Sequence, residues 1–174
     1  SQRVLVNQAL QTFRDDVENL DPDTEGSAFR RRVDNALKRF ERINEERQRI
    51  EADPGWTVAR TLDFYSNNIA SLFAVELELA GETDDRNLIR NVATFVSLGR
   101  YKEAASQERG VVYAVASTGR FAPGEFQRFA TPLGAQDTWR AQFDINASSE
   151  QAARLDALQT NPDVTQTNAL RNYL

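Results

Sequence analysis

The stretch DDRNLIRNVATFVSLGRYKEAASQERGVVYAVAST, residues 84–118, contains no proline and only two glycines. Apolar and small side chains recur along it at alternating intervals of four and three residues, which predicts one long helix of about 50 Å with a seam toward a helical core. The residues of this expected seam are Leu88, Val92, Phe95, Gly99, Lys102, Ser106, Arg109, Tyr113 and Ala116.

The middle of the expected seam is polar, from Gly99 through Lys102 and Ser106 to Arg109. A buried arginine is costly unless its charge is compensated. Two partners remain open for Arg109 at this point. One is a carboxylate of the chain, at Glu76, Glu103 or Glu108, and the other is a ligand.

The rest of the chain is also typical of helices separated by short breaks. Proline, glycine or aspartate interrupts the periodicity after residues 20, 52, 80, 118 and 159, and Ser148-Ser149 follows residue 147. We therefore expect helices over residues 3–20, 27–52, 56–80, 84–118, 123–147, 148–159 and 163–174, with a kink at Pro132 and a capping box at Ser148 and Gln151. No stretch alternates like a strand. The expected fold is all-α, an elongated antiparallel bundle with long helices.

Composition limits the function. The chain has 174 residues, 40% hydrophobic and 27% charged, with a net charge of −5, and it has no cysteine, histidine or methionine. The usual general bases and metal ligands are therefore missing, and no basic block suggests direct nucleic-acid binding. The neighbouring acid pairs, such as Asp15-Asp16 and Glu45-Glu46, lack the spacing of a metal site. We expect no enzyme, no metal and no cofactor.

Arginine is the side chain suited to bind a small planar oxyanion, because its fork of donors keeps its charge and tolerates partial burial. Arg171 follows Val164 and Asn168 at helical spacing, so it is expected to face inward like Arg109. Arg47 is a charge in an otherwise apolar row, and it either snorkels to solvent or serves a ligand. The candidate ligand-binding residues are Arg109, Arg171, Arg47 and Ser106.

The segment LGRYKEAASQERGVVYAVASTGRF, residues 98–121, resembles the second-half signature of the nitrate- and nitrite-sensing (NIT) domain, a KE pair followed by an ER-small triplet, an apolar stretch and a Gly-x-Phe turn. Five other segments resemble segments of the family in the same order. They are SQR with NQAL in residues 1–10; Phe40, Ile43, Arg47 and Ile50; Leu62, Tyr65 and Ile69; Trp139, Phe143 and Ala147; and Val164 with Arg171.

The resemblance implies an all-helical sensor domain of a bacterial receptor, such as a chemoreceptor or histidine kinase. It implies a location between two membrane helices, facing the periplasm, with a cytoplasmic location as the alternative. The anion contacts of the family come from arginines, which here match Arg109 and Arg171. The family normally opens with an LQxERG helix, so residues 1–174 would form one sensor domain without that first helix.

The expected function is therefore recognition of a small anion, nitrate or nitrite, by inward-facing arginines, with a helix shift that reaches a signalling module. The parent protein is expected to be membrane-anchored, and the domain to form a homodimer. Two alternatives stay open. One is a structural or dimerisation module without a ligand, and the other is a helical sensor of another small organic anion.

Overall fold

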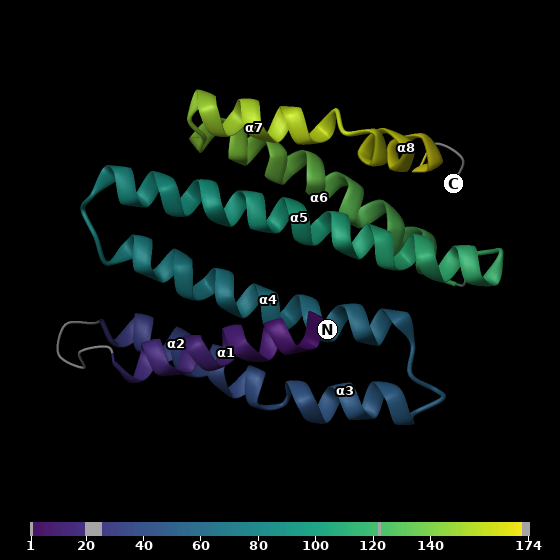
Figure 1. The fold of residues 1–174 in the computed structure, drawn as a ribbon, viewed down its shortest axis with the longest axis horizontal. Coiled ribbons are helices and arrows are strands. Elements are labelled where there is room, and N and C mark those ends of the chain that lie inside the picture. The colour runs from purple at the N-terminus through teal and green to yellow at the C-terminus, as the bar shows by residue number, and fades with distance from the viewer. Residues whose placement is uncertain (1, 20–25, 122, 172–174) are drawn as a thin grey trace.

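The computed structural model describes residues 2–19, 26–121 and 123–171, and within these ranges the chain forms eight helices and no strand (Figure 1). The expectation of an all-α bundle is confirmed. The helices are α1 Gln2–Glu18, α2 Ser27–Glu41, α3 Ile43–Ala52, α4 Val58–Gly81, α5 Arg86–Thr118, α6 Glu125–Asn146, α7 Ser149–Gln159 and α8 Pro162–Arg171.

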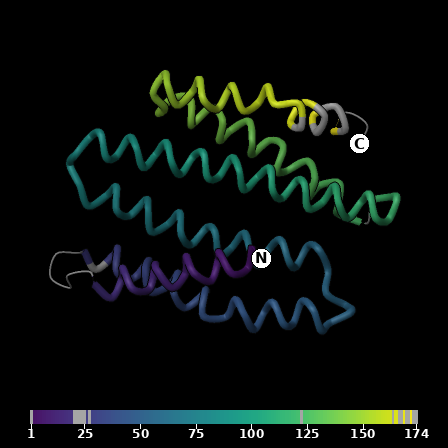
Figure 2. Tube along the Cα trace, in the orientation of Figure 1, coloured from purple at the N-terminus to yellow at the C-terminus, as the bar shows by residue number. Residues whose placement is uncertain are grey.

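The two longest helices, α4 and α5, run antiparallel through the middle of the molecule (Figure 1). Helix α4 packs on one side against α2, and α5 packs on the other side against α6. Helices α1 to α3 therefore lie on one side of the central pair and α6 to α8 on the other, as the Cα trace also shows (Figure 2). No helix in the described part of the chain is long and apolar enough to cross a membrane.

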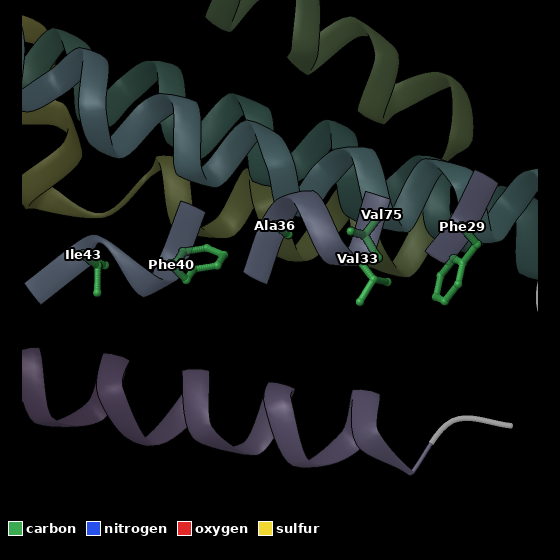
Figure 3. Packing of buried hydrophobic residues seen from close by; sticks show 6 residues of the cluster. All are labelled: Phe29, Val33, Ala36, Phe40, Ile43 and Val75. Atoms are coloured by element: carbon green, nitrogen blue, oxygen red, sulfur yellow. The ribbon is translucent and has the colours of Figure 1, made fainter. Parts of the chain in front are cut away.

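The main core lies between α1, α2, α3 and α4. Its buried side chains follow the predicted four-three spacing along α2 into α3, and Val75 of α4 joins them (Figure 3). These residues are Phe29, Val33, Ala36, Phe40, Ile43 and Val75. Helix α1 covers this core with partly buried side chains only, since none of its described residues is fully buried. A second cluster, Val111, Val115 and Phe129, joins α5 to α6.

Helix α5 presents the opposite face to the one predicted. Its buried residues include Ser97, Ala104, Glu108, Val111 and Val115, whereas Leu88, Phe95, Arg109 and Tyr113 of the predicted seam are exposed. The row of buried residues lies two residues later in the sequence than the predicted seam. Two residues correspond to a rotation of about 200° around the helix axis, so the two rows lie on nearly opposite faces of α5. The expected inward face of Arg109 was therefore wrong, because apolar residues occur on both sides of this helix.

Helix boundaries agree with the predictions to within about two residues except at one place. The single helix expected over residues 27–52 is divided at Arg42 into α2 and α3. Asp85 caps α5, since its carboxylate accepts hydrogen bonds from two backbone N–H groups of the first turn. Gly26 precedes α2 as its N-cap.

Other local expectations have mixed outcomes. The capping box of Ser148 and Gln151 is confirmed. Pro132 lies inside α6 and is buried, and the kink there stays a prediction. The break at residues 21–23 and the end of the last helix at 172–174 lie outside the described residues.

Candidate anion-binding arginines

Arg109 and Ser106 lie on the outward side of α5. Arg109 is exposed, and the described residues offer it no hydrogen bond or ion pair. The hydroxyl of Ser106 donates to the backbone carbonyl of Lys102 in its own helix, at 3.0 Å. Arg109 therefore faces solvent and Ser106 is partly buried, whereas Gly99 of the same predicted window packs against the Phe73 ring of α4.

Glu108, the neighbour of Arg109, occupies the interior position instead. Glu108 is only 4% exposed. Its two carboxylate oxygens accept hydrogen bonds from Nε and Nη2 of the Arg171 guanidinium. The Gln136 amide also donates to Glu108, at 2.8 Å, and accepts from Arg171 at 3.3 Å. This network joins α5, α6 and α8.

The Glu108 network accounts for Arg171. The arginine does face inward, as its spacing in the last helix predicts, but a carboxylate already neutralises it in a bidentate pair. Sequence reasoning missed Glu108 as an interior residue. The signal was available, since Glu108 precedes the buried Val111 and Val115 by three and seven residues.

Arg47 on α3 is buried, with 6% exposure, and it has a different environment. Its Nη1 donates to the side-chain oxygens of Asn7, at 2.7 Å, and Asn44, at 3.2 Å. Its Nε is buried without a hydrogen-bond partner. Within the described chain, no carboxylate lies within ion-pair distance of Arg47, so only neutral groups contact this charge.

The two asparagines make Arg47 reachable. Asn7 and Asn44 are both exposed, so the buried guanidinium lies directly beneath two solvated amides where α1 meets α3. One helical turn further along the same contact, Arg3 of α1 pairs with Glu51 of α3, both exposed. These polar contacts bridge the two helices beside the apolar core.

Arg100 is a further arginine that the sequence did not single out. Its guanidinium carbon lies 4.6 Å from the centre of the Trp139 ring and 5.6 Å from that of Phe73, and its Nε is buried without a hydrogen-bond partner. Aromatic faces stabilise this cation in place of a carboxylate. The contact links α4, α5 and α6.

Comparison with known proteins gives the family. The model of the nitrate and nitrite sensing family, NIT, matches residues 1–174, the whole chain. The chain belongs to the NIT family. No curated protein and no solved structure matches this NIT domain.

The four residues predicted for ligand binding do not form one site in this NIT domain. Arg47 on α3 and Arg171 on α8 lie on opposite sides of the central α4–α5 pair, and Ser106 and Arg109 lie on the surface of α5 (Figure 1). The arginines differ in the charge around them, and this difference separates a candidate anion site from a structural ion pair.

Proposed function

We propose that this NIT domain senses a small planar oxyanion, nitrate or nitrite, and that Arg47 is the residue that binds it. The observation that carries the proposal is the burial of Arg47 with no carboxylate beside it. Removing a charge from water costs several kcal/mol unless a counter-charge is present. A bound anion would supply that counter-charge.

The groups around Arg47 suit a planar anion. The guanidinium presents donors in a fixed fork that matches two oxygens of nitrate. Asn7 and Asn44 now turn their oxygens toward Arg47, but rotation of either amide would turn its NH2 group toward an incoming anion. One cation and two amides then surround the oxyanion with donors.

Helix α1 is the element whose position anion binding at Arg47 would influence. None of its described residues is fully buried, and Asn7 and Arg3 supply its polar contacts to α3. An anion held between Arg47 and Asn7 would favour the arrangement in which α1 is docked on α3. This is a population shift between two helix arrangements. The change in free energy between them cannot exceed the difference in the ligand's binding free energy for the two arrangements.

Arg171, Arg109 and Ser106 have weaker support as ligand contacts. An anion at Arg171 would have to displace Glu108, whose carboxylate would then be buried without its cation. Arg109 and Ser106 would offer an anion only solvent-exposed contacts. Their ligand-binding roles stay predictions.

The wider setting follows from the family resemblance. We propose that residues 1–174 act as one sensor domain in the extracytoplasmic part of a membrane-anchored bacterial receptor. The signal of anion binding would pass along the long helices to an output module.

The test is thermal unfolding with sodium nitrate and sodium nitrite, compared with sodium chloride at equal ionic strength. The variants are Arg47→Met and, as a matched control at an exposed position outside the proposed sites, Arg154→Met. A ligand at 100 times its Kd stabilises the folded state by about 2.7 kcal/mol. The native chain and Arg154→Met should melt higher in nitrate or nitrite than in chloride.

Arg47→Met should lose the response to nitrate and nitrite while keeping its stability in chloride, because the exposed Asn7 and Asn44 can hydrogen-bond to water instead. This split distinguishes an anion site from a structural arginine. An unchanged nitrate response in Arg47→Met would overturn the proposal, and so would the absence of any response in the native chain.

A second candidate function, a dimerisation module, is favoured by the outer face of α5. Leu88, Phe95 and Tyr113 on this face are 39%, 59% and 73% exposed, and they follow seam spacing. Large apolar side chains in one row mark an interaction surface. We propose a homodimer through this face. Sedimentation equilibrium should show a dimer that Phe95→Asp converts to a monomer, and a native monomer would refute it.

A further inference from the structure

A second basic site lies away from Arg47. A cavity of about 660 Å³ opens between α2, α3 and α4, next to the break between α2 and α3 at Arg42. Four cationic side chains line it, together with two acidic ones and the rings of Trp56 and Phe64. The cations are Lys38, Arg39, Arg42 and Arg60, and the acids are Glu46 and Asp63.

The two acids of this cavity are already engaged. Glu46 accepts hydrogen bonds from Arg42, at 3.3 Å, and from Arg49, at 2.9 Å. Asp63 is held by Arg128 of α6 through two hydrogen bonds, at 2.9 and 3.2 Å. The acids therefore leave an excess of positive charge along the cavity wall.

The cations at the end of α2 carry this excess. Lys38 and Arg39 have no carboxylate within ion-pair distance among the residues that the structure describes. Across the cavity, Arg60 stacks on Trp56 at 4.3 Å and reaches Asp53 only at 3.9 Å. Three cations thus border the cavity with little or no compensation.

Asn68 adds a second requirement for a ligand, since its side-chain oxygen needs a hydrogen-bond donor. It lines the cavity but is only 3% exposed, and its side-chain oxygen has no hydrogen-bond partner. Its amide nitrogen donates to the Phe64 carbonyl at 2.8 Å, so a flipped amide would set two oxygens against each other. A buried acceptor without a donor is destabilising. A ligand that carries a donor would satisfy it.

We propose that this cavity binds a hydroxylated organic polyanion, a di- or tricarboxylic hydroxy acid. The carboxylates pair with Lys38, Arg39 and Arg60, and the hydroxyl donates to the side-chain oxygen of Asn68. Nitrate does not meet these requirements, because it has one charge and no hydrogen-bond donor. The site is separate from Arg47 and does not depend on the sensing of nitrate.

The test uses two probes that differ in a single group. Citrate has three carboxylates and a hydroxyl, and tricarballylate has the same three carboxylates without the hydroxyl. Isothermal titration should show citrate binding at millimolar concentrations or below. Tricarballylate should bind about tenfold more weakly, the equivalent of one hydrogen bond.

Three variants locate the site. Asn68→Leu, close in volume and without an acceptor, should bind both probes equally, because the hydroxyl then has no partner. The double variant Lys38→Gln and Arg39→Gln should weaken both probes by about tenfold or more. Arg47→Met should bind citrate like the native chain, so the outcome is independent of the nitrate experiment.

Several results would overturn the inference. These are no heat with millimolar citrate, equal affinity of the native chain for the two probes, and citrate binding that the Lys38 and Arg39 substitutions leave unchanged. Tighter binding of inorganic phosphate than of citrate would also exclude a hydroxy acid as the ligand class. Circular dichroism of Asn68→Leu checks its helix content, and the Lys38 and Arg39 variant changes only exposed side chains.

Discussion

Removal of the Arg171 guanidinium should destabilise the fold, because it leaves the buried Glu108 carboxylate without its counter-charge. Glu108 is 4% exposed in the native chain, and in Arg171→Met it loses the cation that contacts both of its oxygens. Only the Gln136 amide, at 2.8 Å, would still donate to it. The remaining charge is then buried with one neutral hydrogen bond.

The expected loss is about 3 kcal/mol. Breaking a buried ion pair by removing one partner costs about 3–5 kcal/mol. The lower end applies here because the Arg171 side chain is 30% exposed, against 6% for that of Glu108. The matched control is Arg154→Met. Arg154 pairs with Glu150, but the two side chains are 78% and 75% exposed, so this loss should be about 0.5 kcal/mol or less.

The double variant separates charge burial from lost packing. In Glu108→Gln with Arg171→Met no charge remains, and the new amide can hydrogen-bond to Gln136. Replacing both partners of a buried pair is often close to neutral, so the double variant should be more stable than Arg171→Met by about 2 kcal/mol. Urea unfolding followed by circular dichroism gives all the free energies. A loss in Arg171→Met no larger than in Arg154→Met, or a double variant less stable than Arg171→Met, would refute the reasoning.

Four further variants test other positions by the same urea unfolding. Burial raises the pKa of Glu76 above its ordinary 4.5, and one carboxylate oxygen lacks a partner. Glu76→Gln should therefore be more stable than the native chain at pH 7, with a difference that shrinks as the pH falls through the raised pKa, and a pH-independent difference would contradict this. An alanine Cβ at Gly99 would lie 2.5 Å from the Phe73 ring, so Gly99→Ala should lose about 1–3 kcal/mol, whereas Gly134→Ala, with nothing within 4 Å, should gain about 0.5–1 kcal/mol. Asp85→Ala should lose about 1 kcal/mol with the cap of α5, and no change would mean that the cap does not stabilise this helix.

The sequence predicts the helices well because local signals define them. The four-three spacing of Phe29, Val33, Ala36, Phe40 and Ile43 predicts their buried row, and the structure buries all five. Proline, glycine and capping residues fix the ends of most helices to within a few residues. These signals act within a few residues of one another, so they can be recognised without knowledge of the packing.

The orientation of α5 could not be predicted in the same way. Leu88, Phe95 and Tyr113 on one side compete with Val96, Val111 and Val115 on the other. The choice depends on which side finds partners in α4 and α6, and that is a property of the assembled bundle. Periodicity alone gives a seam without saying which of two seams is buried.

The candidate sites were even less accessible to sequence reasoning. Arg47 meets Asn7 across 40 residues of chain, and Glu108 meets Arg171 across 63. Spacing identified Arg47 as a charge in an apolar row and Arg171 as an inward-facing residue, but it could not identify their partners. The partners decide the interpretation, since a carboxylate pairs with Arg171, whereas the side-chain groups that hydrogen-bond to Arg47 are neutral amides.

The Glu-Arg pair at residues 108 and 109 shows how one motif can divide its roles. Neighbouring residues of a helix point about 100° apart, so one of them can face the interior while the other faces solvent. Here Glu108 is buried and holds α6 and α8 through Gln136 and Arg171, and Arg109 faces outward. Arg109 shares the outer row of α5 with Phe95 and Tyr113, the row proposed for the dimer. A contribution of Arg109 to ligand binding or signalling would therefore be exerted at a contact between two copies of the chain, and Arg109→Met should then alter dimer stability without changing the fold of the monomer.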